Sequence, residues 1–269
     1  MTHPDLSARI DPVATTARLT AASRARDSRR ADRLVDDPLA SVLAGAQGEE
    51  MLAQAEAGDV IPVRTRWFDD RLRAAVASGV DQVVLVAAGM DTRAWRLGLG
   101  PTTLLVEVDR PELLALKADL LATAPPPDAT RVPVGADLTT AWDDDVLAAG
   151  IDPARPVCWV VEGLLQYLAA DDVDRLLDRI TALSAPGSHL LIDVVGQALL
   201  DLLAPTPMLA RFARLGMPWV FGSDDPAGLV AGRGWTSEVH LFGEVAVASG
   251  RSSLAPPGGP DGYLVHATR

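Results

Sequence analysis

Short runs of apolar residues recur along most of the chain and predict buried β-strands. Most of these runs are apolar at successive positions and do not alternate with polar residues. The predicted strands span 82–89, 102–109, 130–137, 156–163, 188–196, 235–242 and 262–269. Because a strand that is apolar on both faces must be covered on both sides, the pattern favours a largely parallel sheet between two layers of helices.

Helix-prone segments alternate with these strands and also precede the first of them. The segments 111–124 and 171–184 lie between predicted strands, and the acidic start of 171–184 suits a helix N-terminus. Before the first strand we expect a helix at 13–34, a short second segment that closes on Gly45, and a third helix at 63–78. This alternation indicates an α/β fold with a doubly wound sheet.

The length of the chain and the absence of an interdomain linker favour one domain. Its 269 residues are within reach of a single α/β domain with insertions, and they contain no repeat and no interdomain linker. Prolines interrupt the helix-prone stretch 197–220, and a Pro- and Gly-rich loop at 252–262 separates the last two strands. The expected single domain at 1–269 comprises a helical cap at 13–79, a ligand-binding core at 80–196, a lid or substrate insertion at 197–233 and the last two strands at 234–269.

Charge and cysteine usage narrow the classes of partner. The formal net charge is −12, whereas nucleic acids and anionic membranes attract basic faces. The single cysteine, Cys158, has no partner for an internal disulfide, which fits a reducing compartment. No apolar run is long enough to span a bilayer, and the N-terminus lacks the pattern of a signal peptide. We therefore expect a cytoplasmic protein with neither a nucleic-acid nor a membrane partner.

Small or acidic residues stand at the ends of four consecutive predicted strands. These residues are Gly89, Asp109, Asp137 and Glu162. Ligands of open parallel sheets bind beyond the carboxyl ends of the strands, and Asp109 follows Gly89 at the spacing typical of an acid that binds ribose hydroxyls. One aspartate after a strand is more often a helix cap than a ligand contact. Four such strand ends together predict a shared binding site.

The acidity of this edge indicates the class of ligand. The loop AAGMDT at 87–92 has no G-x-G-x-x-G motif, and Asp91 would repel a phosphate, which disfavours a nicotinamide cofactor. S-adenosylmethionine fits better, because it joins a nucleoside to a sulfonium and an ammonium group and carries only one carboxylate. No spacing typical of metal ligands is present, so we expect no metal site.

Several motifs together resemble those of the leucine carboxyl methyltransferase family, most closely its bacterial S-adenosylmethionine-dependent members. The motifs that carry this resemblance are VVLVAAGMDTRAWRL at 83–97, VEVDRP at 106–111, ADL at 136–138, VVEGLLQYL at 160–168, RTRWFDDRL at 64–72, GRGWTSEV at 232–239 and GYLVHATR at 262–269. The resemblance covers about residues 15–269. It implies a Rossmann-like class I methyltransferase fold, with a seven-stranded, mostly parallel sheet whose last strand is antiparallel.

The resemblance also implies roles around the cofactor by matched position. Arg64 would pair with the carboxylate of the methionine moiety, a task that suits a guanidinium group. Gly89 would let the backbone pass under the cofactor, and Asp109 would bind the ribose hydroxyls. Glu162 would face the amino acid end of the cofactor. Arg93 is expected to be a structural partner of a nearby aspartate and not a substrate contact.

The resemblance also suggests which residues would contact the adenine of the cofactor and which would contact the methyl acceptor. Asp137 and Leu138 would hold the adenine, through a carboxylate bond to its amino group and a backbone contact. Tyr167 would point toward the methyl group and the acceptor, unless it simply packs its helix. Trp67 and Trp219 are candidates for the wall of the acceptor pocket.

One position departs from the family pattern. The family has G-A-G where this chain has Ala87-Ala88-Gly89. An alanine costs little at position 87 if the backbone there is extended. If φ is positive, weaker cofactor binding is expected, and a cofactor-binding protein with degenerate activity becomes an alternative.

The chemistry of the acceptor depends on whether a general base is present. A carboxylate acceptor is already ionised near neutral pH and needs no base, whereas a hydroxyl or phenol needs one. The four histidines are at 3, 189, 240 and 266, and none is expected in the site. The sequence therefore favours methyl-ester formation on a small-molecule or peptide carboxylate, with a hydroxyl or phenol acceptor as the alternative.

Overall fold

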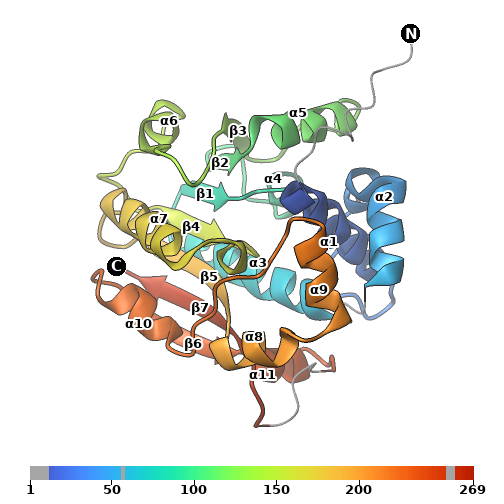
Figure 1. The fold of residues 1–269 in the computed structure, drawn as a ribbon. Helices are drawn as coiled ribbons and strands as arrows, with labels where there is room; N and C mark the ends of the chain where they lie inside the picture. The colour runs from blue at the N-terminus through green and yellow to red at the C-terminus, as the bar shows by residue number, and fades with distance from the viewer. Residues whose placement is uncertain (1–11, 56–57, 253–257) are drawn as a thin grey trace.

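A seven-stranded sheet forms the centre of the protein (Figure 1). The computed structural model describes residues 12–55, 58–252 and 258–269. The strands are β1 (Gln82–Val86), β2 (Leu104–Asp109), β3 (Thr130–Gly135), β4 (Cys158–Val161), β5 (His189–Val195), β6 (Thr236–Leu241) and β7 (Gly262–Thr268). Their order is β3-β2-β1-β4-β5-β7-β6, and β7 runs antiparallel to both neighbours. The predicted strands and the antiparallel last strand are confirmed.

The register of the central strands brings their carboxyl ends to one edge. In β1, Val86 lies beside Val108 of β2 and beside Val161 of β4, and all three strands are parallel. The next residues along each strand therefore meet at the same edge of the sheet. This register places Ala87, Asp109 and Glu162 together although they are far apart in the sequence.

Alternate side chains of the strands pack against helices on opposite faces. Val84 and Val86 belong to a core cluster with helix α7 (Ala170–Ala182), whereas Val83 and Leu85 pack with helix α3 (Val60–Ala77). Helices α6 (Asp143–Ala148) and α10 (Pro226–Ala231) lie on the α7 side, and α11 (Phe242–Ala248) lies on the α3 side. The predicted two-sided covering of the sheet is therefore present.

The N-terminal helices pack as a pair above the carboxyl edge. Helix α1 (Pro12–Ser28) and helix α2 (Ala40–Gln54) form a third apolar cluster with α5 (Pro111–Leu120). Two helical pieces make up α2: the first closes on Gly45 as predicted, and the second continues from there to Gln54. Gly45 adopts a φ of +56° and is not helical, so the chain kinks between the two pieces at this residue.

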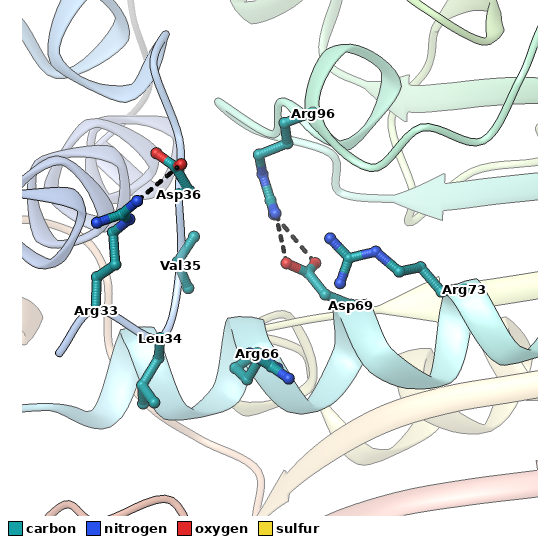
Figure 2. Close-up of a pocket in the computed structure, with 8 residues that line it drawn as sticks. All are labelled: Arg33, Leu34, Val35, Asp36, Arg66, Asp69, Arg73 and Arg96. Carbon is teal, nitrogen blue, oxygen red and sulfur yellow. Dashed lines mark hydrogen bonds and ion pairs between the residues drawn. The ribbon is translucent and has the colours of Figure 1, made fainter.

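The chain between α1 and α2 leaves a hollow against α3, which Figure 2 shows. The hollow has a volume of about 270 Å³ and is mostly polar in its lining. The residues that line it are Arg33, Leu34, Val35, Asp36, Arg66, Asp69, Arg73 and Arg96. Arg96 belongs to the one-turn helix α4 (Arg93–Arg96), which follows β1.

The stretch predicted to be interrupted by prolines forms two short helices. Helix α8 (Gln197–Leu203) and helix α9 (Pro207–Arg214) are joined at Thr206, whose hydroxyl accepts a bond from the amide of Leu209 at 3.4 Å. The side chain of Arg211 in α9 donates to Gln54 at the end of α2, so this segment reaches the N-terminal helices (Figure 1).

The structure describes only part of the predicted loop at 252–262. Residues 253–257 of the predicted loop lie outside the described residues. Among the residues that are described, no helix combines the length and apolar character needed to cross a membrane.

Candidate active site

A cavity of about 250 Å³ opens at the carboxyl edge of β1, β2 and β4. Its walls come from α1, from the loops that follow these strands and from the 3₁₀-helix η2 (Leu165–Tyr167). The predicted site residues that line it are Arg64, Ala87, Gly89, Asp109, Asp137, Leu138, Glu162 and Tyr167. The structure thus gathers in one cavity the residues that the sequence assigned to the cofactor.

Asp109 is held at the cavity wall by two backbone amides. Its Oδ2 accepts a bond from the amide of Gly89 at 2.6 Å, and its Oδ1 accepts one from the amide of Arg110 at 2.7 Å. Burial raises the pKa of Asp109, and these two amide bonds partly oppose the shift. A carboxylate can accept about four hydrogen bonds, so each oxygen retains capacity for one ligand hydroxyl.

The loop after β1 has a positive φ at two positions. Gly89 has a φ of +50°, and a Cβ there would lie 3.0 Å from Cβ of Ala17 in α1. Ala87 has a φ of +58°, the one such non-glycine residue in the described part of the chain. The backbone at position 87 is therefore not extended, and an alanine in this conformation costs about 1–2 kcal/mol.

Arg64 lies between two acidic strand ends. Its Nε donates to Glu162 Oε1 and its Nη1 donates to Asp193 Oδ2, each at 3.0 Å. Burial would lower the pKa of Arg64, but Asp193 and Glu162 outweigh burial and raise it. Asp193 also accepts the amide of Gly163 at 2.6 Å. Asp193 was not predicted, although a lone acid in the apolar run LLIDVV at 190–195 was a usable signal.

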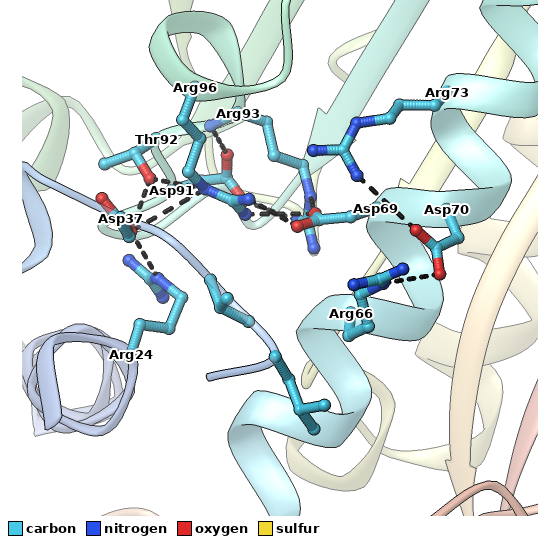
Figure 3. A network of polar contacts seen from close by, with 12 residues as sticks. Arg24, Asp37, Arg66, Asp69, Asp70, Arg73, Asp91, Thr92, Arg93 and Arg96 are labelled. Atoms are coloured by element: carbon cyan, nitrogen blue, oxygen red, sulfur yellow. Dashed lines mark hydrogen bonds and ion pairs between the residues drawn. The ribbon is translucent and has the colours of Figure 1, made fainter. Parts of the chain in front are cut away.

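Arg93 is buried among three carboxylates, of which Figure 3 shows Asp69 and Asp91. It donates to Asp69 at 2.7 Å, to Asp91 at 2.6 Å and to Glu162 at 2.7 Å. Burial would raise the pKa of Asp91, but Arg93 and more distant cations lower it to about 2. The expected structural pairing of Arg93 with a nearby aspartate is confirmed. Asp91 is therefore neutralised by a fixed partner instead of facing a ligand alone.

The same network continues into the cap (Figure 3). Asp69 accepts bonds from Arg96 as well as from Arg93. Arg96 lies 3.8 Å from Asp37, which accepts Nε of Arg24 at 2.9 Å. Arg24 lines the cavity, so the ionic network joins helix α1 to the strand ends.

Carboxylates outnumber guanidinium groups in this network. The five carboxylates are Asp37, Asp69, Asp91, Glu162 and Asp193, and the four guanidinium groups are those of Arg24, Arg64, Arg93 and Arg96. Five negative and four positive charges give a formal charge of −1. Arg24, Arg64, Asp91, Arg93 and Glu162 of this network line the cavity, and its other members stand behind them. A surrounding network with a formal charge of −1 is suited to a ligand with net positive charge.

The far end of the cavity is formed by the chain after β3. Asp137 is exposed, and its Oδ1 accepts both the amide and the hydroxyl of Thr139, at 2.9 and 2.7 Å. These bonds lower the pKa of Asp137. Leu138 is half-buried and packs against the main core. An acid and an apolar side chain thus lie side by side where the adenine is expected.

An aromatic group lies at the opposite end of the cavity. The ring of Tyr167 meets that of Trp219 edge-on at 6.4 Å, and Phe212 of α9 lies 6.2 Å from Trp219. The amide of Val220 donates to the carbonyl of Gln166 at 2.7 Å, which holds this segment against η2. Trp219 does not line the cavity itself, and Phe212 was not among the predicted residues.

Trp67 lies elsewhere. It is buried on α3 in the core beneath the sheet, where the guanidinium of Arg71 stacks over its ring at 3.9 Å and His240 lies beside it. It is not among the residues that line the cavity. Its spacing on a helix did not reveal which face would meet the sheet.

The described histidines lie away from the cavity. Nδ1 of His189 lies 2.9 Å from Nε2 of His266 at the amino end of β5, and His240 lies on β6. None of these three lines the cavity, and His3 lies outside the described residues.

Comparison with known proteins supports the same assignment. The sequence model of the leucine carboxyl methyltransferase family matches residues 17–181, more than half of the chain. The chain belongs to this family. A relative in Parafrankia is 44% identical over 219 residues, which cover 76% of this chain and 71% of its own. A relative in Frankia alni is 37% identical over 98% of both chains, and both relatives bear the name "Putative S-adenosyl-L-methionine-dependent methyltransferase".

The fold of this methyltransferase family member also matches solved structures. The crystal structure of a DUF574 family protein from Streptomyces avermitilis superposes with a TM-score of 0.64 at 17% identity, covering 89% of this chain and 97% of that one. The sheet order and the antiparallel β7 are those of the Rossmann-like class I methyltransferase fold that the sequence predicted.

Proposed function

We propose that this chain transfers a methyl group from S-adenosylmethionine to a carboxylate oxygen and forms a methyl ester. The observation that carries the proposal is the cavity at the carboxyl edge, where Gly89, Asp109 and the ionic network meet. S-adenosylmethionine, when bound, supplies an electrophilic methyl group on a sulfonium centre. The acceptor is a small molecule or the C-terminus of a peptide.

The residues of the cavity fit this cofactor. The two oxygens of Asp109 are held by amides and retain capacity for the two ribose hydroxyls. Asp137 and Leu138 offer an acceptor for an amino group and an apolar surface for a ring. The ionic network around the cavity, with a formal charge of −1, complements a ligand that carries two positive charges and one negative charge.

Arg64 and Glu162 are suited to the amino acid end of the cofactor. Both are anchored before any ligand enters, Arg64 by Glu162 and Asp193, and Glu162 by Arg64 and Arg93. Their mutual bonds fix the direction of each charge, so little reorganisation is needed on binding. Arg64 would hold the carboxylate through N–H groups directed toward the cavity.

The acceptor end supports a carboxylate nucleophile. None of the described histidines lines the cavity, and a carboxylate needs no general base near neutral pH. Tyr167, supported by Trp219, would orient the acceptor for in-line attack and exclude water from it. We assign Tyr167 to this positioning of the acceptor at the reacting centre.

The test uses the different stability of methyl esters and methyl ethers in base. The purified chain is incubated with S-adenosylmethionine labelled in its methyl group and with matched panels of carboxylic acids and phenols. Label that appears in product and is released as methanol by mild base supports the proposal. Base-stable label would show hydroxyl or phenol methylation instead. Cofactor binding without transfer to any panel would favour a degenerate, non-catalytic protein.

One variant distinguishes a role of Tyr167 in positioning the acceptor from a role in binding the cofactor. Tyr167→Phe keeps the ring against Trp219 but removes the hydroxyl. We expect slower methyl transfer with unchanged cofactor affinity. An equal fall in the rate of methyl transfer and in cofactor affinity would indicate that Tyr167 contacts the cofactor instead.

A further inference from the structure

The hollow between residues 33–36 and α3 lies back to back with the cofactor cavity. Asp69 lines the hollow, and it accepts a bond at 2.7 Å from Arg93, which lines the cofactor cavity. The two spaces therefore adjoin at this ion pair, and their linings have no residue in common. Nothing in the proposed methyl transfer uses the hollow.

Positive charge is in excess around this hollow. Its lining contains four guanidinium groups and two carboxylates, in a chain whose net charge is −12. Asp69 is already engaged by Arg93, which is buried, and by Arg96, whose side chain is 4% exposed. The remaining carboxylate, Asp36, is exposed and lies 3.5 Å from Arg33. With Asp70, which pairs with Arg66 and Arg73, four guanidinium groups face three carboxylates, and the local charge of +1 is opposite in sign to that of the molecule.

Arg66 and Arg73 supply the accessible donors. They are seven residues apart on α3, so they lie along one side of the helix, and their side chains are 49% and 45% exposed. Both depend on a single carboxylate, Asp70, at 2.7 and 3.5 Å. Within the described residues, no hydrogen bond engages the Nη groups of Arg66 or any nitrogen of Arg73.

The arrangement of these groups suits a tetrahedral oxyanion. Figure 2 shows Arg73 extending from α3 toward Asp69, Arg66 lying across the same helix, and Arg96 descending from the opposite side. A planar carboxylate presents two oxygens, whereas a phosphate presents three or more in different directions and can accept from several guanidinium groups. A volume of about 270 Å³ leaves room beyond the phosphate for a small attached group.

We propose that this hollow is a second ligand site, which binds a phosphate dianion, free or as the ester of a small molecule, through Arg66 and Arg73. The ligand would bridge α3 and the chain between α1 and α2. Arg33 would contribute from the rim and Arg96 from the roof.

The test is calorimetric titration of the full chain with inorganic phosphate and, separately, with glycerol 3-phosphate, at ionic strength held constant with chloride. We expect saturable binding of one equivalent. A tighter complex with the ester would identify an esterified ligand, and a tighter complex with inorganic phosphate would identify the free ion. In Arg66→Gln/Arg73→Gln, we expect the affinity to fall at least about tenfold.

Matched controls keep the result specific. Arg155→Gln/Arg175→Gln removes the same charge from two exposed arginines that each pair with an aspartate elsewhere, and we expect it to bind as the wild type does. Arg66→Lys/Arg73→Lys retains the charge without the paired donors and should bind with intermediate affinity. The absence of saturable binding to the folded wild type, or an equal loss in the Arg155/Arg175 control, would overturn the proposal.

Discussion

The two ends of the same strands carry different kinds of polar side chain. At the amino end of β1, Gln82 is buried and neutral, and it exchanges bonds of 3.1 and 2.7 Å with the carbonyl and amide of Asp152. At the carboxyl ends, Asp109, Glu162 and Asp193 carry charge around a cavity. Neutral amides are sufficient where the chain only has to close a loop. The charges at the carboxyl ends are suited to a charged ligand, and they need partners because burying them is costly.

The largest effect on stability is expected from replacing Arg93, which lies at the centre of the ionic network at the carboxyl ends of the strands. Arg93→Met would leave three carboxylates without their shared partner, and we expect the free energy of unfolding to fall by about 3–5 kcal/mol. Urea unfolding followed by circular dichroism measures this. Arg155→Met, on an exposed ion pair with Asp81, is the control and should cost at most about 1 kcal/mol. Similar losses in both variants would show that the network is not a buried unit.

The second prediction concerns Asp109, at the carboxyl end of β2, whose replacement should weaken cofactor binding without unfolding the protein. Asp109→Asn retains an oxygen for one backbone amide but loses the charge and one acceptor. We expect about a 10- to 100-fold loss of cofactor affinity with an intact fold. Asp152→Asn, at the amino ends of the strands, is the control and should bind as the wild type does. Unchanged affinity in Asp109→Asn would remove this residue from the site.

A smaller effect of opposite sign is expected in the loop after β1. Ala87→Gly relieves a φ of +58° but adds conformational freedom to the unfolded chain. The balance should stabilise the fold by about 0.5–1 kcal/mol. Thermal unfolding measures the change, and Ala88→Gly, whose backbone has no positive φ, is the matched control and should destabilise. Destabilisation by both would show that the left-handed backbone is not strained.

The last prediction concerns a pH effect at the amino end, which is absent near neutral pH. Burial, with a further contribution from His189, lowers the pKa of His266 from 6.5 to about 4. Because the folded-state pKa is the lower one, this contribution to stability is complete above pH 6.5 and is lost as the pH falls toward 4. His266→Gln should flatten the pH dependence of unfolding in this window while leaving cofactor affinity unchanged. An unaltered pH profile would contradict this assignment.

The strands and the strand-end residues could be predicted because their signals are local. Apolar runs specify the strands, and the parallel register then brings Gly89, Asp109 and Glu162 to one edge without further information. Trp67 and Phe212 could not be assigned, because the helix face that meets the sheet or the cavity depends on tertiary packing. The positive φ of Ala87 could not be predicted either, because an alanine gives no local indication of this conformation.

The most direct test of the central claim is a calorimetric titration of the wild-type chain with S-adenosylmethionine and with its demethylated product. The claim is that the charged strand ends form a site for a cationic nucleoside. It predicts one site per chain and tighter binding of the sulfonium form, because the product has lost a positive charge near an ionic network of formal charge −1. A folded sample that binds neither compound, or that binds the neutral product more tightly at every ionic strength, would contradict the claim.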